Sequence, residues 1–193
     1  DISSQSDDDD ATPTDDDDTT PPEEVFRGLW ASMEITSSGE TLIAYYDYLE
    51  GGLALARGTG GSFSHEQVDG YTYETEGGLP VNPGDRGRYL DMALDASDRP
   101  HIAYHDLEET SLMYATFDGT EWATETLDGT SGSDSVGTFN SIALDGSGNP
   151  AIAYYDAGEK ALKIAYYSAG WVDEVVDEGE LLADGIAAEL DEP

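Results

Sequence analysis

Hydrophobic and polar residues alternate along short stretches of the chain, and these stretches recur in the same order three times. In the middle of the chain, Leu90, Met92 and Leu94 alternate with polar or small residues, which is the pattern of a strand with one buried face. Clusters of Gly, Asp, Asn and Pro separate the stretches and favour tight turns. No stretch has a helical period of useful length. The pattern therefore predicts an all-β chain of short antiparallel strands.

The stretches form a threefold internal repeat. Its copies span 30–69, 89–128 and 139–177, and they contain the matching segments "TLIAYYD", "PHIAYHD" and "PAIAYYD". The aromatic residues at equivalent positions are Trp30, Tyr89 and Phe139 at the start of each copy, and Phe63, Trp122 and Trp171 towards its end. Four short strands in about 40 residues are the pattern of a β-propeller blade. The sequence thus predicts three four-stranded blades, with the large rings packed between blades.

The third copy, "SIALDGSGNPAIAYYDAGEKALKIAYYSAGWVDEVVD", resembles the blades of secreted bacterial β-propellers of the Asp-box/sialidase-like type. The Asp-box itself is only partly present, because "FDGTEW" at 117–122 has Asp-Gly before Trp while the other two copies lack that Asp. The resemblance implies a propeller fold. It implies no single function, since such blades occur in lectins, in glycosidases and in proteins without known activity.

The predicted repeat domain spans 26–178, between an N-terminal arm (1–25) and a C-terminal tail (179–193). The arm carries two runs of four aspartates among Thr and Pro, and such a run repels itself. A closed propeller usually has four or more blades, so three blades leave sheet edges that favour pairing with another chain. We expect Val25, Phe26 and Leu29 to serve assembly as part of a donated strand. The tail is expected to cap an edge or to dock on another subunit.

Acidic residues dominate the composition, with 43 Asp and Glu against 7 Lys and Arg and a formal net charge of -36. This charge repels nucleic acid and anionic membrane surfaces, and it favours cations, basic partners or a saline environment. The chain has no cysteine, which excludes disulfides and thiolate chemistry. No apolar stretch is long enough for membrane insertion. Because the sequence begins at Asp1 without Met, we expect a secreted or cell-surface protein whose leader has been removed.

Two sets of side chains are candidate binding residues. The first consists of carboxylates that calcium could use as hard oxygen ligands: Asp47, Asp106 and Asp156 at the ends of the second strands, and Asp95, Asp98 and Asp145 in the preceding turns. Turn capping is the alternative role for both groups of carboxylates. The second set, Tyr46, His105 and Tyr155, could stack against sugars. A further set, Glu66, Glu125 and Glu174, is expected to face solvent.

No Ser-His-Asp set or phosphate-binding glycine loop is recognisable, and the arginines occupy non-equivalent repeat positions. We therefore expect a non-enzymatic extracellular protein that self-assembles into a ring, array or filament, assisted by calcium that screens the acidic charge. The alternative is a carbohydrate-binding propeller of lectin type. A third hypothesis is a fragment of a glycosidase-like enzyme, since that chemistry needs two carboxylates. No cofactor other than calcium is expected.

Overall fold

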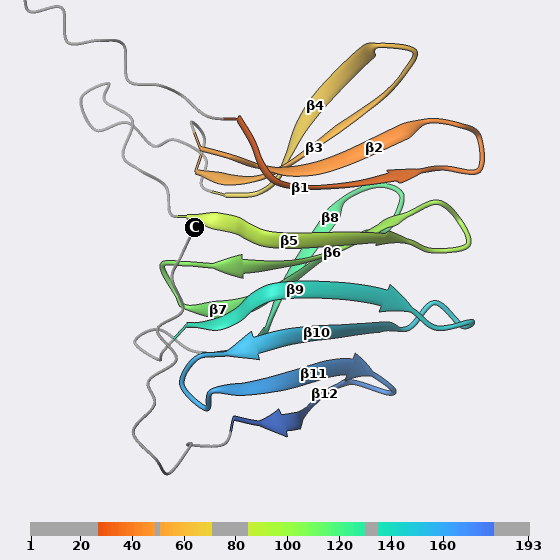
Figure 1. The fold of residues 1–193 in the computed structure, drawn as a ribbon. Coiled ribbons are helices and arrows are strands. Elements are labelled where there is room, and N and C mark those ends of the chain that lie inside the picture. Colours follow the sequence, from red (N-terminus) through yellow and green to blue (C-terminus); the bar gives the residue numbers. More distant parts are fainter. Residues whose placement is uncertain (1–26, 49–50, 71–84, 130–134, 180–193) are drawn as a thin grey trace, which may run out of the picture.

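The computed structural model describes residues 27–48, 51–70, 85–129 and 135–179. These residues form three antiparallel sheets of four strands each, and none of them forms a helix (Figure 1). The predicted all-β architecture of three four-stranded sheets is thereby confirmed. The whole arm with Val25, the following Phe26, and the tail apart from Gly179 lie outside the described residues, whereas Leu29 lies in the first strand and is 40% exposed. No helix long and apolar enough to cross a membrane occurs among the residues described.

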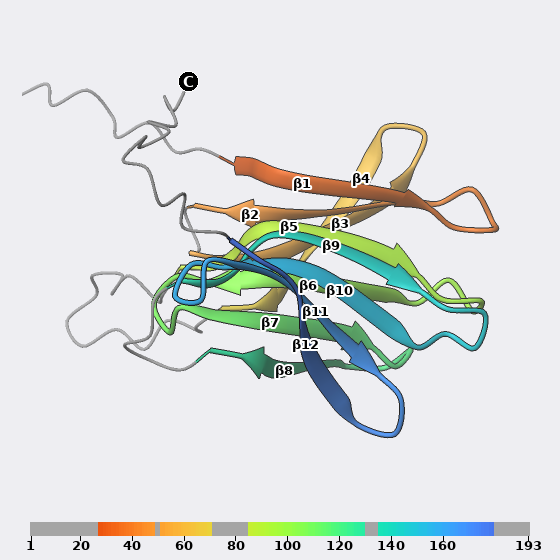
Figure 2. The same cartoon turned by 60° about the horizontal axis from the view of Figure 1, so that its bottom comes forward.

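Each sheet is a simple meander in which strands consecutive in the chain pair with each other. The first blade contains β1 (Arg27–Ile35), β2 (Thr41–Asp47), β3 (Gly52–Thr59) and β4 (Ser62–Asp69). The second contains β5 (Arg86–Leu94), β6 (Pro100–Asp106), β7 (Ser111–Phe117) and β8 (Trp122–Asp128). The third contains β9 (Val136–Leu144), β10 (Pro150–Asp156), β11 (Ala161–Tyr167) and β12 (Trp171–Glu178). The blades follow one another face to face, as Figures 1 and 2 show.

The first strands of the three blades, β1, β5 and β9, lie side by side and connect the blades. Each has an irregularity in its pairing with the next strand, at the position of the first repeat aromatic. There Trp30, Tyr89 and Phe139 have positive φ angles of 50°, 51° and 55°, which is unusual for bulky residues. Their rings form a row, with centroid distances of 5.6 Å between the first two and 4.9 Å between the last two. The repeated bulge thus places one aromatic ring of every blade in a single row.

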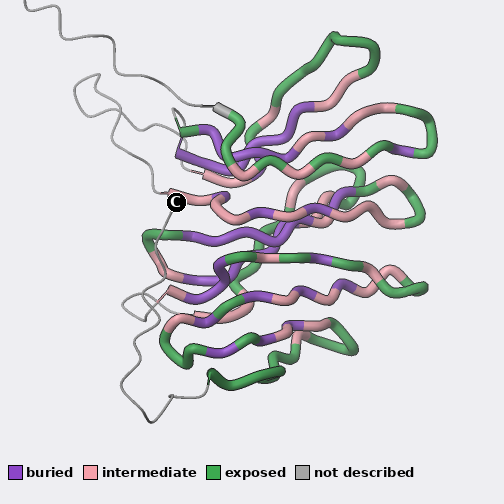
Figure 3. The backbone as a smooth tube through the Cα atoms, viewed as in Figure 1, coloured by how far each residue is buried: buried purple, intermediate pink, exposed green. Residues whose placement is uncertain are grey.

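The hydrophobic core lies between blades rather than inside them. At the junction of the first and second blades, Leu53 and Leu55 belong to one buried cluster with Tyr104. At the junction of the second and third, Leu112 and Tyr114 belong to another with Tyr154. We call these contacts junction 1–2 and junction 2–3. In Figure 3 the buried stretches run along the strands, while β12 is exposed along nearly its whole length.

The late repeat aromatics occupy the same junctions. Trp122 packs against the core of junction 1–2 and Trp171 against that of junction 2–3, which confirms their expected place between blades. Phe63 differs, because it is 39% exposed at the equivalent position of the first blade. Phe139 contacts Tyr89 of the second blade, yet it is 72% exposed, so the expectation of packing between blades was wrong for Phe63 and holds for one side of Phe139 only. The reason is that no blade precedes the first or follows the third among the residues described.

Candidate functional site

A charged and aromatic cluster lies at the outer part of junction 1–2. Arg57 of β3 and Glu66 of β4 form an ion pair, with 3.0 Å between Nη2 and Oε1, and their side chains are 32% and 39% exposed. The Arg57 guanidinium lies over the ring of Phe117 in the second blade, 5.7 Å from its centroid. The ring of Trp122 lies 5.3 Å from that of Phe117. A cation, a carboxylate and two aromatic rings from two blades thus meet at the molecular surface.

Two N–H groups of this cluster are buried without a hydrogen-bond partner among the described residues. They are Nε of Arg57 and Nε1 of Trp122. Leaving a buried donor unpaired costs about 1–3 kcal/mol, and native proteins contain few such groups. A ligand that brings acceptor oxygens to the cluster would remove this cost. The unpaired donors therefore mark the cluster as a candidate binding site.

The equivalent place at junction 2–3 is arranged differently. Thr116 stands at the repeat position of Arg57, and Glu125 stands at that of Glu66. Without a neighbouring arginine, Glu125 accepts a hydrogen bond of 3.0 Å from Nε1 of Trp171. The Trp171 ring also packs at 5.0 Å against Tyr114, where burial raises the pKa of the Tyr114 hydroxyl to about 12. At junction 2–3 the indole N–H of Trp171 therefore has a hydrogen-bond partner within the protein.

The glutamates of the repeat do more than face solvent. Glu66 pairs with Arg57, Glu125 accepts from Trp171, and Glu174 accepts from the hydroxyl of Tyr166 at 2.7 Å. Glu125 and Glu174 are exposed, as expected, and Glu66 is partly exposed, while each also makes a polar contact with a neighbouring side chain. Only the contact of Glu125 with Trp171 joins two blades, because Arg57 and Tyr166 belong to the same blades as Glu66 and Glu174.

The tyrosines and the histidine expected to stack on sugars are not brought together. Tyr46 and His105 are buried, at 2% and 0% exposure, and their rings lie 5.6 Å from Trp30 and 6.1 Å from Tyr89 respectively. Tyr155 lies on the third blade and is 37% exposed. Tyr46 and His105 are buried, so they offer little ring surface to a sugar. Of the three residues, only Tyr155 is exposed enough to stack on one, and sugar stacking stays a prediction.

The candidate calcium ligands accept hydrogen bonds from neighbouring backbone. Asp95 accepts from the N–H groups of Ser97 and Arg99, and Asp106 from those of Glu108 and Glu109. Asp145 and Asp156 do the same in the third blade, and Asp98 accepts from Ser37 N in the first. Asp47 is buried, at 4% exposure. The described residues contain no group of three or more His, Asp or Glu side chains arranged to hold a metal, and calcium stays a prediction.

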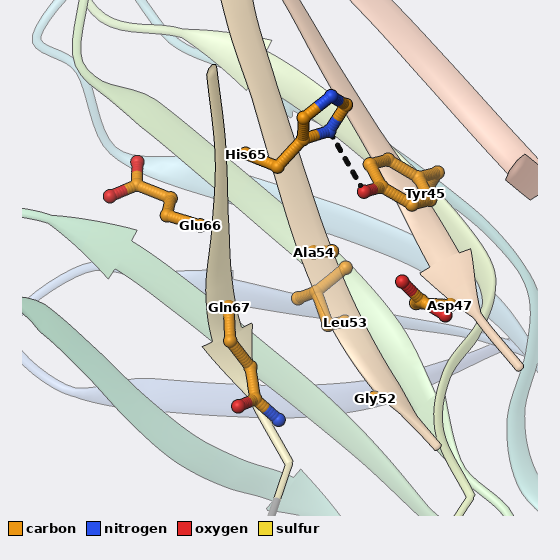
Figure 4. A pocket seen from close by; sticks show the side chains of 8 residues that line it. All are labelled: Tyr45, Asp47, Gly52, Leu53, Ala54, His65, Glu66 and Gln67. Carbon is orange, nitrogen blue, oxygen red and sulfur yellow. Dashed lines mark hydrogen bonds between the residues drawn. The ribbon is translucent and has the colours of Figure 1, made fainter. Parts of the chain in front are cut away.

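Two hollows lie near these carboxylates. One of about 330 Å³ separates the β5–β6 turn from the β9–β10 turn and includes Asp95 and Asp145. The other, of about 180 Å³, lies on the first blade (Figure 4). There Tyr45 of β2 reaches His65 of β4 across β3, with 3.1 Å between the hydroxyl and Nδ1, and Asp47 lies at the end of β2. Neither hollow combines unpaired buried donors with an exposed carboxylate, as junction 1–2 does.

A basic side chain joins the two blades of each junction near the ends of the strands. Lys163 is only 7% exposed, and its Nζ lies 2.7 Å from Asp128 and 3.3 Å from Asp173. Burial alone would raise the pKa of the Asp128 carboxyl, but hydrogen bonds from Lys163 and Tyr154 outweigh it and lower that pKa below its ordinary 3.8. Arg86 has the corresponding place at junction 1–2, 3.3 Å from Asp69 and 2.8 Å from Asp106, although the second contact is not aligned as a hydrogen bond.

Sequence reasoning missed the Arg57–Glu66–Trp122 cluster. The available signal was a departure from the repeat, because one of only seven bases stands where the other copies have Thr116 and Tyr166. Trp122 was assigned to the core and Glu66 to solvent. The pairing of strands alone does not say which face of one blade meets the next, so their proximity was not visible.

Comparison with known proteins identifies the fold. No protein-family model and no curated protein matches the sequence. Among solved structures, the chain is similar to a fucose lectin from Kordia zhangzhouensis, determined in complex with methyl-fucoside. The two share 14% sequence identity with a TM-score of 0.50, and the match covers 77% of this chain and 99% of the lectin chain. At this identity the likeness shows a common arrangement of strands, consistent with three propeller blades.

Proposed function

We propose that the protein is a carbohydrate-binding module of lectin type, and that sugar binds at the Arg57–Glu66–Trp122 cluster of junction 1–2. The observation that carries the proposal is the pair of buried donors, Arg57 Nε and Trp122 Nε1, which have no partner beside an exposed carboxylate. Sugar hydroxyls both donate and accept, so one ligand can satisfy these N–H groups and hydrogen-bond Glu66. The aromatic rings of Phe117 and Trp122 offer apolar surface to the C–H face of the sugar. The structural likeness to a fucose lectin supports this class of ligand.

The charge of the protein narrows the ligand class to neutral sugars. A net charge of -36 repels uronic and sialic acids at a distance, and the single guanidinium of Arg57 is already paired with Glu66. Neutral hexoses and deoxyhexoses carry the required hydroxyls without that repulsion. We therefore expect binding of neutral methyl glycosides and no binding of glucuronate.

Titration calorimetry with a panel of methyl glycosides, methyl-fucoside included, tests the proposal. Arg57→Gln and Glu66→Gln each remove one charged hydrogen-bonding group and should weaken binding by about tenfold or more, because such hydrogen bonds contribute about 1.5–3 kcal/mol. Glu125→Gln is the matched control, since it changes the equivalent glutamate of junction 2–3 and should leave sugar affinity unchanged. Unfolding curves verify that each variant is folded. Equal losses for Glu66→Gln and Glu125→Gln, or no binding by any neutral glycoside, would contradict the proposal.

A further inference from the structure

The two end faces of the blade stack carry the two halves of a blade junction. We propose that a second copy of this chain docks head to tail, so that the third blade of each copy packs against the first blade of the other and closes a six-bladed ring. The proposal rests on a set of contacts that recurs at junctions 1–2 and 2–3 and is half-formed at the two end faces.

The first recurring contact joins a glycine to a leucine. A Cβ atom on Gly87 would lie 3.0 Å from Cα of Leu53 in the preceding blade, and one on Gly137 would lie 2.6 Å from Cα of Leu112. Both glycines have positive φ angles, so the strand passes the leucine at a distance that excludes a side chain. Gly28 has the same conformation, with a φ of 84°, yet a Cβ there would meet nothing within 4 Å. The corresponding leucine is Leu162 at the opposite end.

The second recurring contact is a hydrogen bond from a tyrosine to an aspartate of the preceding blade. The hydroxyl of Tyr104 donates to Asp69 at 2.5 Å, and that of Tyr154 donates to Asp128 at 2.6 Å. At the same repeat positions, the first blade has Tyr45 in place of these tyrosines and the third blade has Asp177 in place of these aspartates. Head-to-tail docking brings Tyr45 of one copy to Asp177 of the other, with Tyr45 exchanging its bond to His65 for the interblade bond.

The third blade exposes apolar side chains at positions that are buried in the other blades. Leu162 is 45% exposed, whereas Leu53 and Leu112 are fully buried at 0%. Val176 is 58% exposed, whereas the equivalent Val68 is 8% exposed. With Phe139 at 72%, these residues form an apolar surface on the last sheet, and surfaces of this kind mark contacts with another protein. Its repeat positions are those that receive the next blade at the internal junctions.

The number of blades selects a dimer. Propellers typically close with about four to eight blades. Two copies of the three described blades give six, which is within this range, whereas three copies give nine, which is outside it. A two-fold axis through the ring centre generates both new junctions from one, which makes the assembly closed. The charge of -36 on each copy opposes this contact, so added salt should strengthen the dimer by screening the repulsion.

Sedimentation and light scattering on the full chain test the proposal, at about 1 to about 100 µM protein and in about 50 to about 500 mM NaCl. We expect a particle of twice the mass of one chain, with a dissociation constant that falls as salt increases. Leu162→Glu should weaken the dimer by about tenfold or more. Leu107→Glu is the matched control, because Leu107 is 40% exposed but lies in the β6–β7 turn of the middle blade, away from both end faces.

A double-mutant cycle with Tyr45→Phe and Asp177→Asn examines the specific contact. Each variant should weaken the dimer, and the two together should weaken it no further than one alone, because they remove the same hydrogen bond. A single-chain mass under all conditions would overturn the proposal, as would masses that keep rising beyond two chains, which indicate an open filament. The sugar site lies within one chain, so a monomeric Leu162→Glu variant that still binds sugar separates this proposal from the proposed function.

Discussion

Junctions 1–2 and 2–3 have the same buried contacts, and they differ in whether the N–H group of their tryptophan indole has a hydrogen-bond partner. Both bury leucines of one blade against a tyrosine of the next, and both have the tyrosine–aspartate hydrogen bond. At junction 2–3, Trp171 finds its partner in Glu125, whereas at junction 1–2 Arg57 takes Glu66 and Trp122 has no partner among the described residues. One departure from the repeat, Arg57 where the other copies have Thr116 and Tyr166, thus distinguishes the proposed binding site from a junction whose indole N–H is already paired. In a repeat protein, the departures from the repeat indicate where function lies.

The largest expected difference in stability concerns Lys163, the buried cation of junction 2–3. Lys163→Met leaves the buried Asp156 and the partly buried Asp128 without their shared cation. Removing one partner of a buried ion pair typically costs about 3–5 kcal/mol of stability, and we expect a loss near the lower end because Asp128 is partly exposed. Arg57→Gln breaks a half-exposed pair at junction 1–2 and should cost less than about 1 kcal/mol. Urea unfolding of both variants measures the difference. Equal losses would show that the two junctions do not differ in this way.

Acid should weaken junction 2–3 through Asp128. The pKa of its carboxyl is lowered in the folded protein, so the folded state gains stability from the ionised form above the ordinary value of 3.8. That stability is lost as the pH falls below this value and through the folded pKa. Thermal unfolding between pH 7 and pH 3 should therefore show a fall in the midpoint temperature that is smaller in Asp128→Asn. The same pH dependence in Asp128→Asn and in the unaltered chain would argue against this assignment.

The smallest expected effect is the difference in stability between substitutions of Trp171 and of Trp122. Trp171→Phe removes a donor that Glu125 uses and should lower the free energy of unfolding by about 1 kcal/mol. Trp122→Phe removes an N–H group that has no partner among the described residues, and with it the cost of burying an unpaired donor. It should therefore lose less stability than Trp171→Phe, or gain some, while sugar binding weakens. Chemical unfolding of the two variants checks the order. A larger loss of stability for Trp122→Phe would mean that its N–H is paired in the folded protein.

The fold could be predicted from the sequence, whereas the candidate site could be predicted only in part. The alternation around Met92 and the segment ending at Asp106 predict strands and their order, because a half-buried strand needs that period. The left-handed backbone at Trp30 was not predictable, since it belongs to an irregularity in the pairing of β1 with β2 that the alternation pattern does not reveal. Tyr46 appeared as a surface residue because it precedes a turn, yet the aromatic row buries it.

The Arg57 site was beyond sequence reasoning for a different reason. Its residue types are visible in the sequence, but their proximity depends on how the first blade faces the second, with Phe117 between Arg57 and Trp122. A repeat specifies the contacts that its copies have in common. Contacts made by a residue present in one copy follow only from the three-dimensional arrangement.

Nuclear magnetic resonance of the three tryptophan indoles gives the most direct test of the central claim. The chain contains only Trp30, Trp122 and Trp171, so the ¹⁵N–¹H indole spectrum has three signals, which single Trp→Phe variants assign. On titration with methyl-fucoside or another neutral glycoside that binds, the Trp122 signal should shift strongly as its N–H gains a partner. The Trp171 signal, already bonded to Glu125, should remain in place. A shift of Trp171 without one of Trp122, or three unchanged signals across the glycoside panel, would contradict sugar binding at junction 1–2.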